Sequence, residues 1–172
     1  MASNLEFITS NSGSSVSTLS IENCFSDKYD IYKVVIDNID FVSADLKFRF
    51  INASGVVSSS NYDSAVLLQR AYGNDALNQT NDGTEFRSIG FYDQSSGVNE
   101  GKGGATVINI FNPFNSSSYT FANWQNAGVS SIGTPARKGV GVLTVSESHT
   151  GINFNASATI LAVKASIYGV KE

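Results

Sequence analysis

The sequence predicts an all-β fold: a single antiparallel β-sandwich or jelly roll of about eight to ten strands, with little helix. Short stretches with apolar residues at alternate positions recur along the chain, Gly, Asn and Asp separate them, and few segments have helical periodicity. A chain of 172 residues is long enough for one domain with a full hydrophobic core.

The N-terminal region predicts two short strands separated by a Ser/Gly-rich stretch. We expect residues 1–15 to form an N-terminal arm or a first edge strand with a hinge at residues 10–15, and residues 16–172 to form the jelly-roll domain. The strands on the two sides of the hinge are Leu5–Thr9 and Val16–Ile21. Such an arm would be able to pair with a neighbouring subunit.

The clearest strand is Leu46–Phe50, in which apolar residues alternate with Lys47 and Arg49. A period of two places the apolar side chains in the core and the two basic side chains in solvent. The preceding stretch, Tyr29–Ile39, is apolar on both sides and predicts a central strand. Three carboxylates around its end, Asp37, Asp40 and Asp45, are interpreted as turn residues.

The same alternation predicts the remaining strands, at Ala65–Gln69, Phe86–Phe91, Ala105–Phe111, Tyr119–Trp124, Val140–Val145, Ile152–Asn155 and Thr159–Tyr168. Residues 64–72 have an alternative as two helical turns. Turn residues predict connectors at 52–55, 81–83, 101–104 and 112–118, and the Asp82-Gly83 pair favours a hairpin. The predicted core comprises Ile31, Val35, Leu46, Phe48, Phe50, Ile108, Ile110, Phe121, Leu143, Val145, Phe154, Val163 and Ile167.

Composition argues against several classes of partner. The net charge is −4 and the basic residues are scattered, so we expect no nucleic acid as a partner. No apolar run approaches the roughly 20 residues of a membrane span, and the first residues have neither a basic nor an apolar stretch typical of a signal peptide. We therefore expect no membrane partner and synthesis without a signal peptide.

The residues available for catalysis and metal binding are few. The single Cys24 cannot form an intrachain disulfide, and one Cys with one His cannot make a zinc site. His149 is expected to be a solvated turn residue, and no G-x-S-x-G motif is present. We therefore predict no catalytic residue, no metal site and no cofactor.

Carboxylates leave two open alternatives. A calcium site is conceivable at Asp37, Asp40 and Asp45 or at Asp75, Asp82 and Glu85, although turn chemistry explains both groups. A glycosidase would need two carboxylates across a cleft, for example Glu85 and Asp93, and nothing in the sequence favours that pair.

Carbohydrate binding is a stronger alternative. Sugars stack on exposed aromatic rings and accept hydrogen bonds from amide side chains. The region around the predicted strand at 119–124 has both residue types. The candidate contacts for a glycan or a protein partner are Asn112, Asn115, Tyr119, Trp124 and Gln125. The competing interpretation is that its aromatic residues are core, with Trp124 as an anchor at a strand end.

An ordered series of short motifs resembles the small jelly-roll structural proteins of tailed bacteriophages, especially those of marine bacteria. The motifs are Tyr29-Asp30-Ile31-Tyr32, Arg49-Phe50-Ile51-Asn52-Ala53-Ser54-Gly55, Tyr62-Asp63-Ser64-Ala65, residues 110–120 and the terminal Ile167-Tyr168-Gly169-Val170-Lys171. The resemblance covers residues 5–171. It implies a virion component present in many copies, made in the host cytoplasm, without enzymatic activity and without catalytic residues to transfer.

Together these observations predict a non-enzymatic virion structural protein that acts through protein–protein contacts, as capsid decoration, fibre or tail component. Its expected partners are other virion proteins and copies of itself in a symmetric oligomer, with a trimer favoured. The alternative is a carbohydrate-binding or adhesion module that recognises host surface glycans. A glycan-degrading enzyme is the weakest interpretation.

Overall fold

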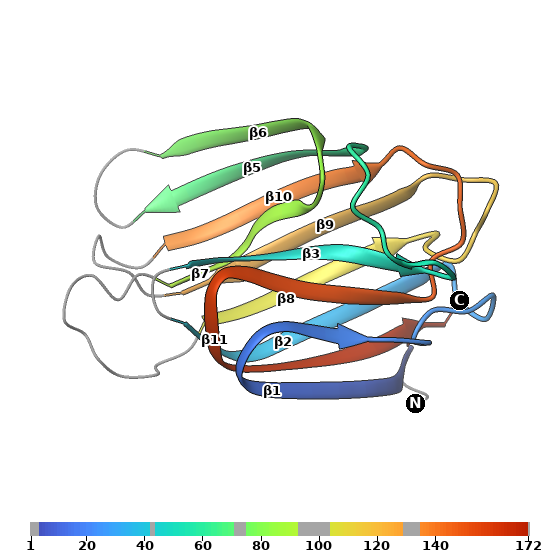
Figure 1. Cartoon of the computed structure of the whole chain (residues 1–172), viewed down its shortest axis with the longest axis horizontal. Helices are drawn as coiled ribbons and strands as arrows, with labels where there is room; N and C mark the ends of the chain where they lie inside the picture. Colours follow the sequence, from blue (N-terminus) through green and yellow to red (C-terminus); the bar gives the residue numbers. More distant parts are fainter. Residues whose placement is uncertain (1–3, 42–43, 71–74, 93–103, 129–134, 172) are drawn as a thin grey trace.

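The structure is a computed structural model that describes residues 4–41, 44–70, 75–92, 104–128 and 135–171. In these ranges the chain forms eleven β-strands and no helix, which confirms the predicted all-β class (Figure 1). The strands are β1 (Leu5–Ile21), β2 (Ile31–Phe41), β3 (Ala44–Asn52), β4 (Gly55–Val56), β5 (Tyr62–Arg70), β6 (Ala76–Gly83), β7 (Phe86–Tyr92), β8 (Gly104–Phe111), β9 (Thr120–Ala127), β10 (Pro135–Leu143) and β11 (Gly151–Val170).

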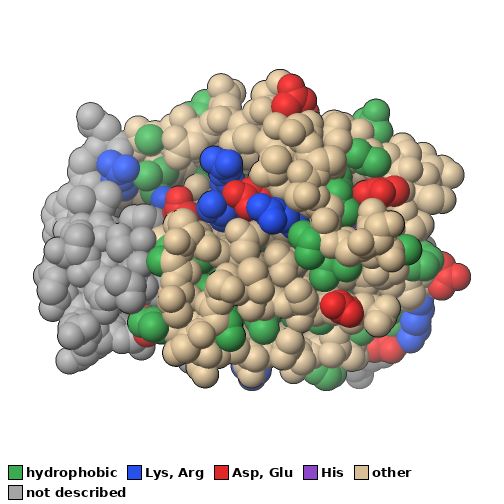
Figure 2. Space-filling view, viewed as in Figure 1, with side chains coloured by type: hydrophobic (Ala, Val, Ile, Leu, Met, Phe, Trp, Pro, Cys, Tyr) green, Lys and Arg blue, Asp and Glu red, His purple; other side chains and the backbone are tan. Residues whose placement is uncertain are grey.

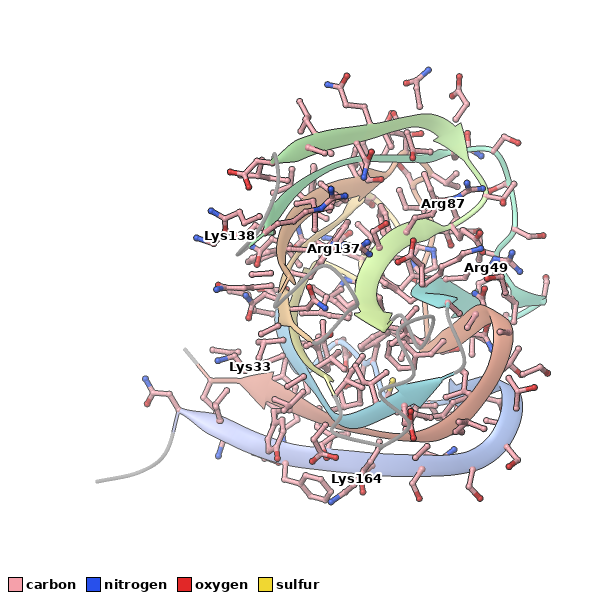
Figure 3. The ribbon with its side chains drawn as sticks, turned by 90° about the vertical axis from the view of Figure 1, so that its left-hand side faces the viewer. Lys33, Arg49, Arg87, Arg137, Lys138 and Lys164 are labelled. Atoms are coloured by element: carbon pink, nitrogen blue, oxygen red, sulfur yellow. The ribbon has the colours of Figure 1, made fainter. Side chains whose placement is uncertain are left out.

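The strands form two layers because the long strands β1 and β11 belong to both. The second half of β11 pairs with the first half of β1 and with β2, and the large sheet continues from β2 through β8, β9, β10 and β5 to β6. The first half of β11 pairs with the end of β1 and with β3, which also pairs with β4 and β7 in a smaller sheet. All pairs are antiparallel. In the view of Figure 3 the large sheet curls around β3 and β7.

The core lies between the layers and is rich in aromatic rings. The Phe86 ring centre lies 4.9 Å from those of Phe48 and Tyr62 and 5.7 Å from that of Trp124. Most of the predicted core is confirmed as buried: Leu46, Phe48, Phe50, Ile108, Ile110, Leu143, Phe154, Val163 and Ile167. The prediction is wrong for Phe121, whose side chain is 45% exposed, and Ile31, Val35 and Val145 are only half-buried.

Strand β10 turns its glycines inward and its valines outward. A Cβ atom at Gly139 would lie 2.1 Å from the Trp124 ring, and one at Gly141 would lie 2.4 Å from the Phe86 ring. These two glycines therefore make the space in which the large aromatic rings pack against the sheet. Since side chains alternate along a strand, Val140 and Val142 point to the outer face.

Three local predictions need correction. Residues 10–15 form no hinge: they lie inside β1, and Ser10 to Ser14 pair with Ser166 to Ala162 of β11. Asp37, Asp40 and Asp45 are not turn residues, since the first two lie inside β2 and Asp45 lies inside β3. Residues 64–70 continue β5 and form no helix. In each case pairing with a distant strand determines the local conformation.

The predicted connectors have mixed outcomes. Residues 52–55 form a tight hairpin in which Asn52 pairs with Gly55. Gly55 has a φ of 116°, a backbone conformation that favours glycine. Asp82 has the positive φ (53°) expected of its turn, but β6 and β7 do not pair with each other: β6 pairs with β5 and β7 with β3. The Asp82-Gly83 segment therefore carries the chain from the large sheet to the small one. Residues 101–103 of the predicted Gly-rich loop lie outside the described residues.

Candidate binding face

The outer face of the large sheet collects most of the exposed apolar side chains. Among the described residues, seven of the nine large hydrophobic side chains that are exposed lie on this face, and we call it the apolar face. These seven are Leu5 and Phe7 of β1, Leu67 of β5, Leu77 of β6, Val107 of β8, Phe121 of β9 and Val140 of β10. The strand register places Leu67 beside Leu77 and Phe121 beside Val142, and exposed apolar groups of this kind mark binding sites in soluble proteins.

Neutral amides lie between these apolar residues. The strand register places Val140 beside Asn123 and Ala65, and continues through Asn109 on one side and Gln79 on the other. The Asn109 Nδ2 group donates a hydrogen bond of 2.8 Å to the Asn123 Oδ1 atom. The apolar face therefore combines hydrophobic contact area with amide groups that donate and accept hydrogen bonds.

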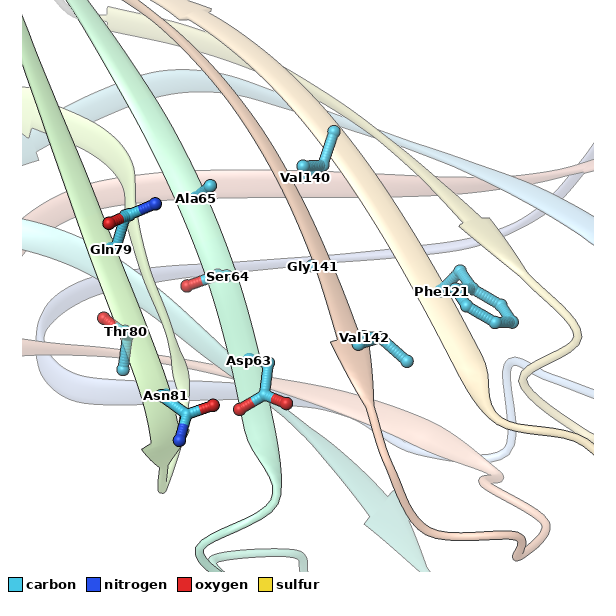
Figure 4. A pocket seen from close by; sticks show the side chains of 10 residues that line it. All are labelled: Asp63, Ser64, Ala65, Gln79, Thr80, Asn81, Phe121, Val140, Gly141 and Val142. Carbon is cyan, nitrogen blue, oxygen red and sulfur yellow. The ribbon is translucent and has the colours of Figure 1, made fainter.

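A groove of about 650 Å³ crosses the part of the apolar face formed by β6, β5, β10 and β9 (Figure 4). Phe121, Val140 and Val142 line one side. The other side is polar, with Asp63, Gln79, Thr80 and Asn81. The carboxylate of Asp63 accepts a 2.8 Å hydrogen bond from the backbone N–H of Asp82, which fixes its position. The groove is open to solvent and presents an aromatic ring opposite a carboxylate and amides, an arrangement suited to non-covalent binding.

The structure separates the residues that the sequence grouped as glycan or partner contacts. Trp124 is only 2% exposed and packs in the core, so it cannot stack on a ligand. Gln125 lies on the exposed side of β9, and Tyr119 is exposed just before this strand. Asn112 and Asn115 line a different hollow of about 190 Å³, together with Asp27, Tyr29 and Asp30.

The missed residues belong to the groove itself. Phe121 was assigned to the core because the alternation of β9 alone does not show which side faces inward. The signal that would have corrected it lies in β10, where Gly139 and Gly141 are too small to fill a core and pair with Trp124 and Ala122 across the sheet. The space left by Gly139 is filled by the inward Trp124 ring, and alternation along β9 then places Phe121 on the outside.

His149 is not a solvated turn residue. It has no exposed surface, and its ring centre lies 4.9 Å from that of Phe50. Its Nε2 atom lies 3.2 Å from a Glu147 carboxylate oxygen and its Nδ1 atom 3.1 Å from the Thr120 hydroxyl. The Nδ1 atom also lies 3.2 Å from the Pro113 carbonyl oxygen, so a neutral ring, which has one N–H, can donate either from Nε2 to Glu147 or from Nδ1 to Pro113. Burial lowers the pKa of His149, and the nearby Glu147 opposes this shift only in part.

The other candidate groups have structural partners. Cys24 is buried, and desolvation raises the pKa of its thiol to about 12, as expected of an inert core cysteine. Asp45 pairs with Arg137, and Glu85 pairs with three basic side chains. Within the described ranges, no three Asp, Glu, His or Cys residues are grouped so that they could hold a metal ion. Asp93 lies outside those ranges.

The comparisons with known proteins give no match: no family model, no curated protein and no solved structure is similar to the chain. In the described part of the chain, no helix is long and apolar enough to cross a membrane.

Proposed function

We propose that this chain is a non-enzymatic structural protein of a tailed-phage virion that associates with copies of itself through the apolar face. The observation that carries the proposal is the concentration of seven exposed large hydrophobic side chains on one face of a single sheet. Covering this face removes apolar surface from water, which stabilises the assembly by about 25 cal/mol per Å² of apolar area buried. The resemblance of the sequence motifs to phage jelly-roll proteins supplies the virion context.

The chemistry of the apolar face favours a second copy of the same chain as its partner. Its amides both donate and accept hydrogen bonds, so two identical surfaces can satisfy each other through them. Lys33 and Lys138 lie on the same face, and their long side chains can keep the ammonium groups in water. Burial of amides also carries a smaller desolvation cost than burial of unpaired charges. This combination suits a protein that is soluble when made and then assembles in many copies.

Sedimentation velocity over a range of protein concentrations tests the proposal. We expect concentration-dependent self-association, weakened by Val140→Ser on the apolar face. Val56→Ser is the matched control, because Val56 is also exposed but lies on β4 of the small sheet. A monomer at all concentrations, or equal effects of the two substitutions, contradicts the proposal. Absence of the chain from purified particles of the phage that encodes it would contradict the virion assignment.

A second candidate function is recognition of host surface glycans in the groove. The specific observation in its favour is the Phe121 ring, which provides a stacking surface across from the polar groups of Asp63, Gln79 and Asn81. A glycan array with the wild type and Phe121→Ala tests it. Binding that is lost in Phe121→Ala supports the groove, and absence of binding by the wild type contradicts this candidate. Trp124→Ala is unsuitable here because Trp124 is part of the core.

A further inference from the structure

We propose that the outer face of the small sheet holds a binding site for a sulfate- or phosphate-type oxyanion, formed by Lys47, Arg49 and Arg87 around Glu85. We call these four residues the basic cluster. Figure 2 shows this group of basic side chains with an acidic one near the middle of the face. The site is separate from the apolar face: in Figure 3, Arg49 and Arg87 lie on the opposite side of the molecule from Lys33 and Lys138.

The basic cluster has two more positive than negative charges. Glu85 is almost completely buried, and its two oxygens receive all three basic groups: Lys47 Nζ at 3.1 Å, Arg49 Nη2 at 2.8 Å and Arg87 Nε at 3.6 Å. Within the described residues, no other carboxylate pairs with these three groups. One carboxylate thus serves three cations in a chain whose net charge is −4.

The strand register makes this excess charge unfavourable. Phe48 of β3 pairs with Phe86 of β7, which brings Arg49 close to Glu85. The ladder is irregular between Leu46 and Phe48, and there Lys47 and Arg87 approach the same Glu85 oxygen, Oε1, at 3.1 and 3.6 Å. Two cations that converge on one carboxylate oxygen repel each other. An anion located between Lys47 and Arg87 would complete the charge pattern that Glu85 begins.

The neighbouring strand adds hydrogen-bond donors. Asn155 and Asn153 of β11 pair with Lys47 and Arg49 of β3, respectively. The Asn153 amide already donates to the Ser20 hydroxyl at 2.8 Å, so the added donor is that of Asn155. The Nδ2 group of Asn155 and the Nε group of Arg49 are buried without a hydrogen-bond partner. Buried donors without acceptors are uncommon in native structures. Here one donor belongs to the basic cluster and the other lies beside its Lys47, where acceptor oxygens are already few.

A tetrahedral oxyanion matches this set of groups. The planar guanidinium of arginine forms paired hydrogen bonds with sulfate and phosphate oxygens, and the ammonium of lysine contributes a mobile charge. Arg87 is about half exposed and Lys47 and Arg49 are partly exposed, so a ligand from solvent can reach their side chains.

An NMR titration of the ¹⁵N-labelled chain with sodium sulfate and, separately, with inorganic phosphate tests the site against sodium chloride at equal ionic strength. We expect saturable shifts of backbone amides in β3 and β7 with sulfate or phosphate but not with chloride. Arg87→Gln should weaken binding about tenfold. Lys138→Gln, which removes a cation from the apolar face, should leave the affinity unchanged. Equal loss in both variants, or no saturable shift beyond that of chloride, overturns the proposal.

Two further measurements complete the test. Glu85→Gln removes the only carboxylate of the cluster and should strengthen sulfate binding. If this variant is too unstable to titrate, sulfate should raise its midpoint of thermal unfolding more than it raises that of the double variant Glu85→Gln/Arg87→Gln, which shares the nonspecific stabilisation by sulfate. No strengthening and no such rescue counts against the site. Dextran sulfate compared with dextran shows whether the oxyanion can be carried on a polysaccharide. Polymer binding that Arg87→Gln and Lys138→Gln weaken equally would indicate a diffuse charge effect and would also overturn the proposal.

Discussion

The outer faces of the two sheets follow the same alternation but have opposite chemistry. On the large sheet, outward positions carry exposed apolar side chains and amides, with separate charges such as those of Lys33, Lys138 and Asp63 between them. On the small sheet, the outward positions of β3 and β7 carry charges around the buried Glu85. The exposed positions of the two sheets therefore carry different kinds of side chain, although both follow the same inward–outward alternation. One face is adapted to being covered and the other to holding charge.

The largest expected effect tests which side of the sheets is the interior. Phe48→Ala should lower the free energy of unfolding by about 3–5 kcal/mol, because the ring is fully buried among other aromatic rings. Phe121→Ala, on the exposed side of β9, should lower it by less than about 1 kcal/mol. Urea denaturation of both variants measures the difference. Similar losses would show that the apolar face is part of a core.

The next effect compares a carboxylate from each outer face. Glu85→Gln should lower the free energy of unfolding by about 1.5–3 kcal/mol, because three basic side chains lose a charged acceptor. Asp63→Asn should have a smaller effect, since its carboxylate accepts one backbone hydrogen bond at an open position. The same denaturation experiment decides. An equal effect of the two substitutions would remove the contrast between the faces.

A third prediction concerns the glycines that turn the valines of β10 outward. Gly139→Ala should cost about 1–3 kcal/mol, because the added methyl group would meet the Trp124 ring. Val140→Ala, one residue further along the same strand, should change stability by about 0.5 kcal/mol or less. Thermal unfolding with tryptophan fluorescence follows both effects at once. A Gly139→Ala variant as stable as the wild type would contradict the packing described here.

The smallest effect is a pH dependence that belongs to neither face. Burial lowers the pKa of His149 below its value of about 6.5 in the unfolded chain, so the unfolded state binds the proton more readily. The contribution of neutral His149 to the free energy of unfolding is therefore fully present above about pH 6.5. It falls as the pH drops below this value, by at most about 1.4 kcal/mol per pH unit. Denaturation between pH 7.5 and about 5.5 should show this decline, and His149→Gln should flatten it. The same slope in both proteins would assign the decline to other groups.

Alternation along single strands predicted much of the fold and little of the site. It correctly placed Phe48 and Phe50 inside and Lys47 and Arg49 outside, because those residues differ strongly in polarity. It failed for Phe121, since the inward direction of β9 depends on Gly139 and Gly141 in a different strand. The partnership of Glu85 with Arg49 has the same origin: the two residues are brought together by the pairing of β7 with β3, which no local pattern encodes.

The burial of His149 shows that alternation cannot predict which side chains of irregular segments are buried. The sequence around it, Glu147-Ser148-His149-Thr150-Gly151, has the composition of a surface turn. Its backbone N–H donates to the Pro113 carbonyl, which belongs to a loop more than thirty residues away. The imidazole also packs against the Phe50 ring, and contacts of this kind between distant segments produce no periodic pattern in the sequence.

The central position of β11 constrains how the chain reaches its native state. Strands β1, β2 and β3, which are made early, all pair with residues 151–170. Before β11 has been synthesised, the strand edges that will pair with it are unpaired. Unpaired strand edges readily pair with strands of other chains. We therefore expect the nascent protein to depend on dilution or chaperones during translation, with native order established in a late cooperative step that closes both layers together.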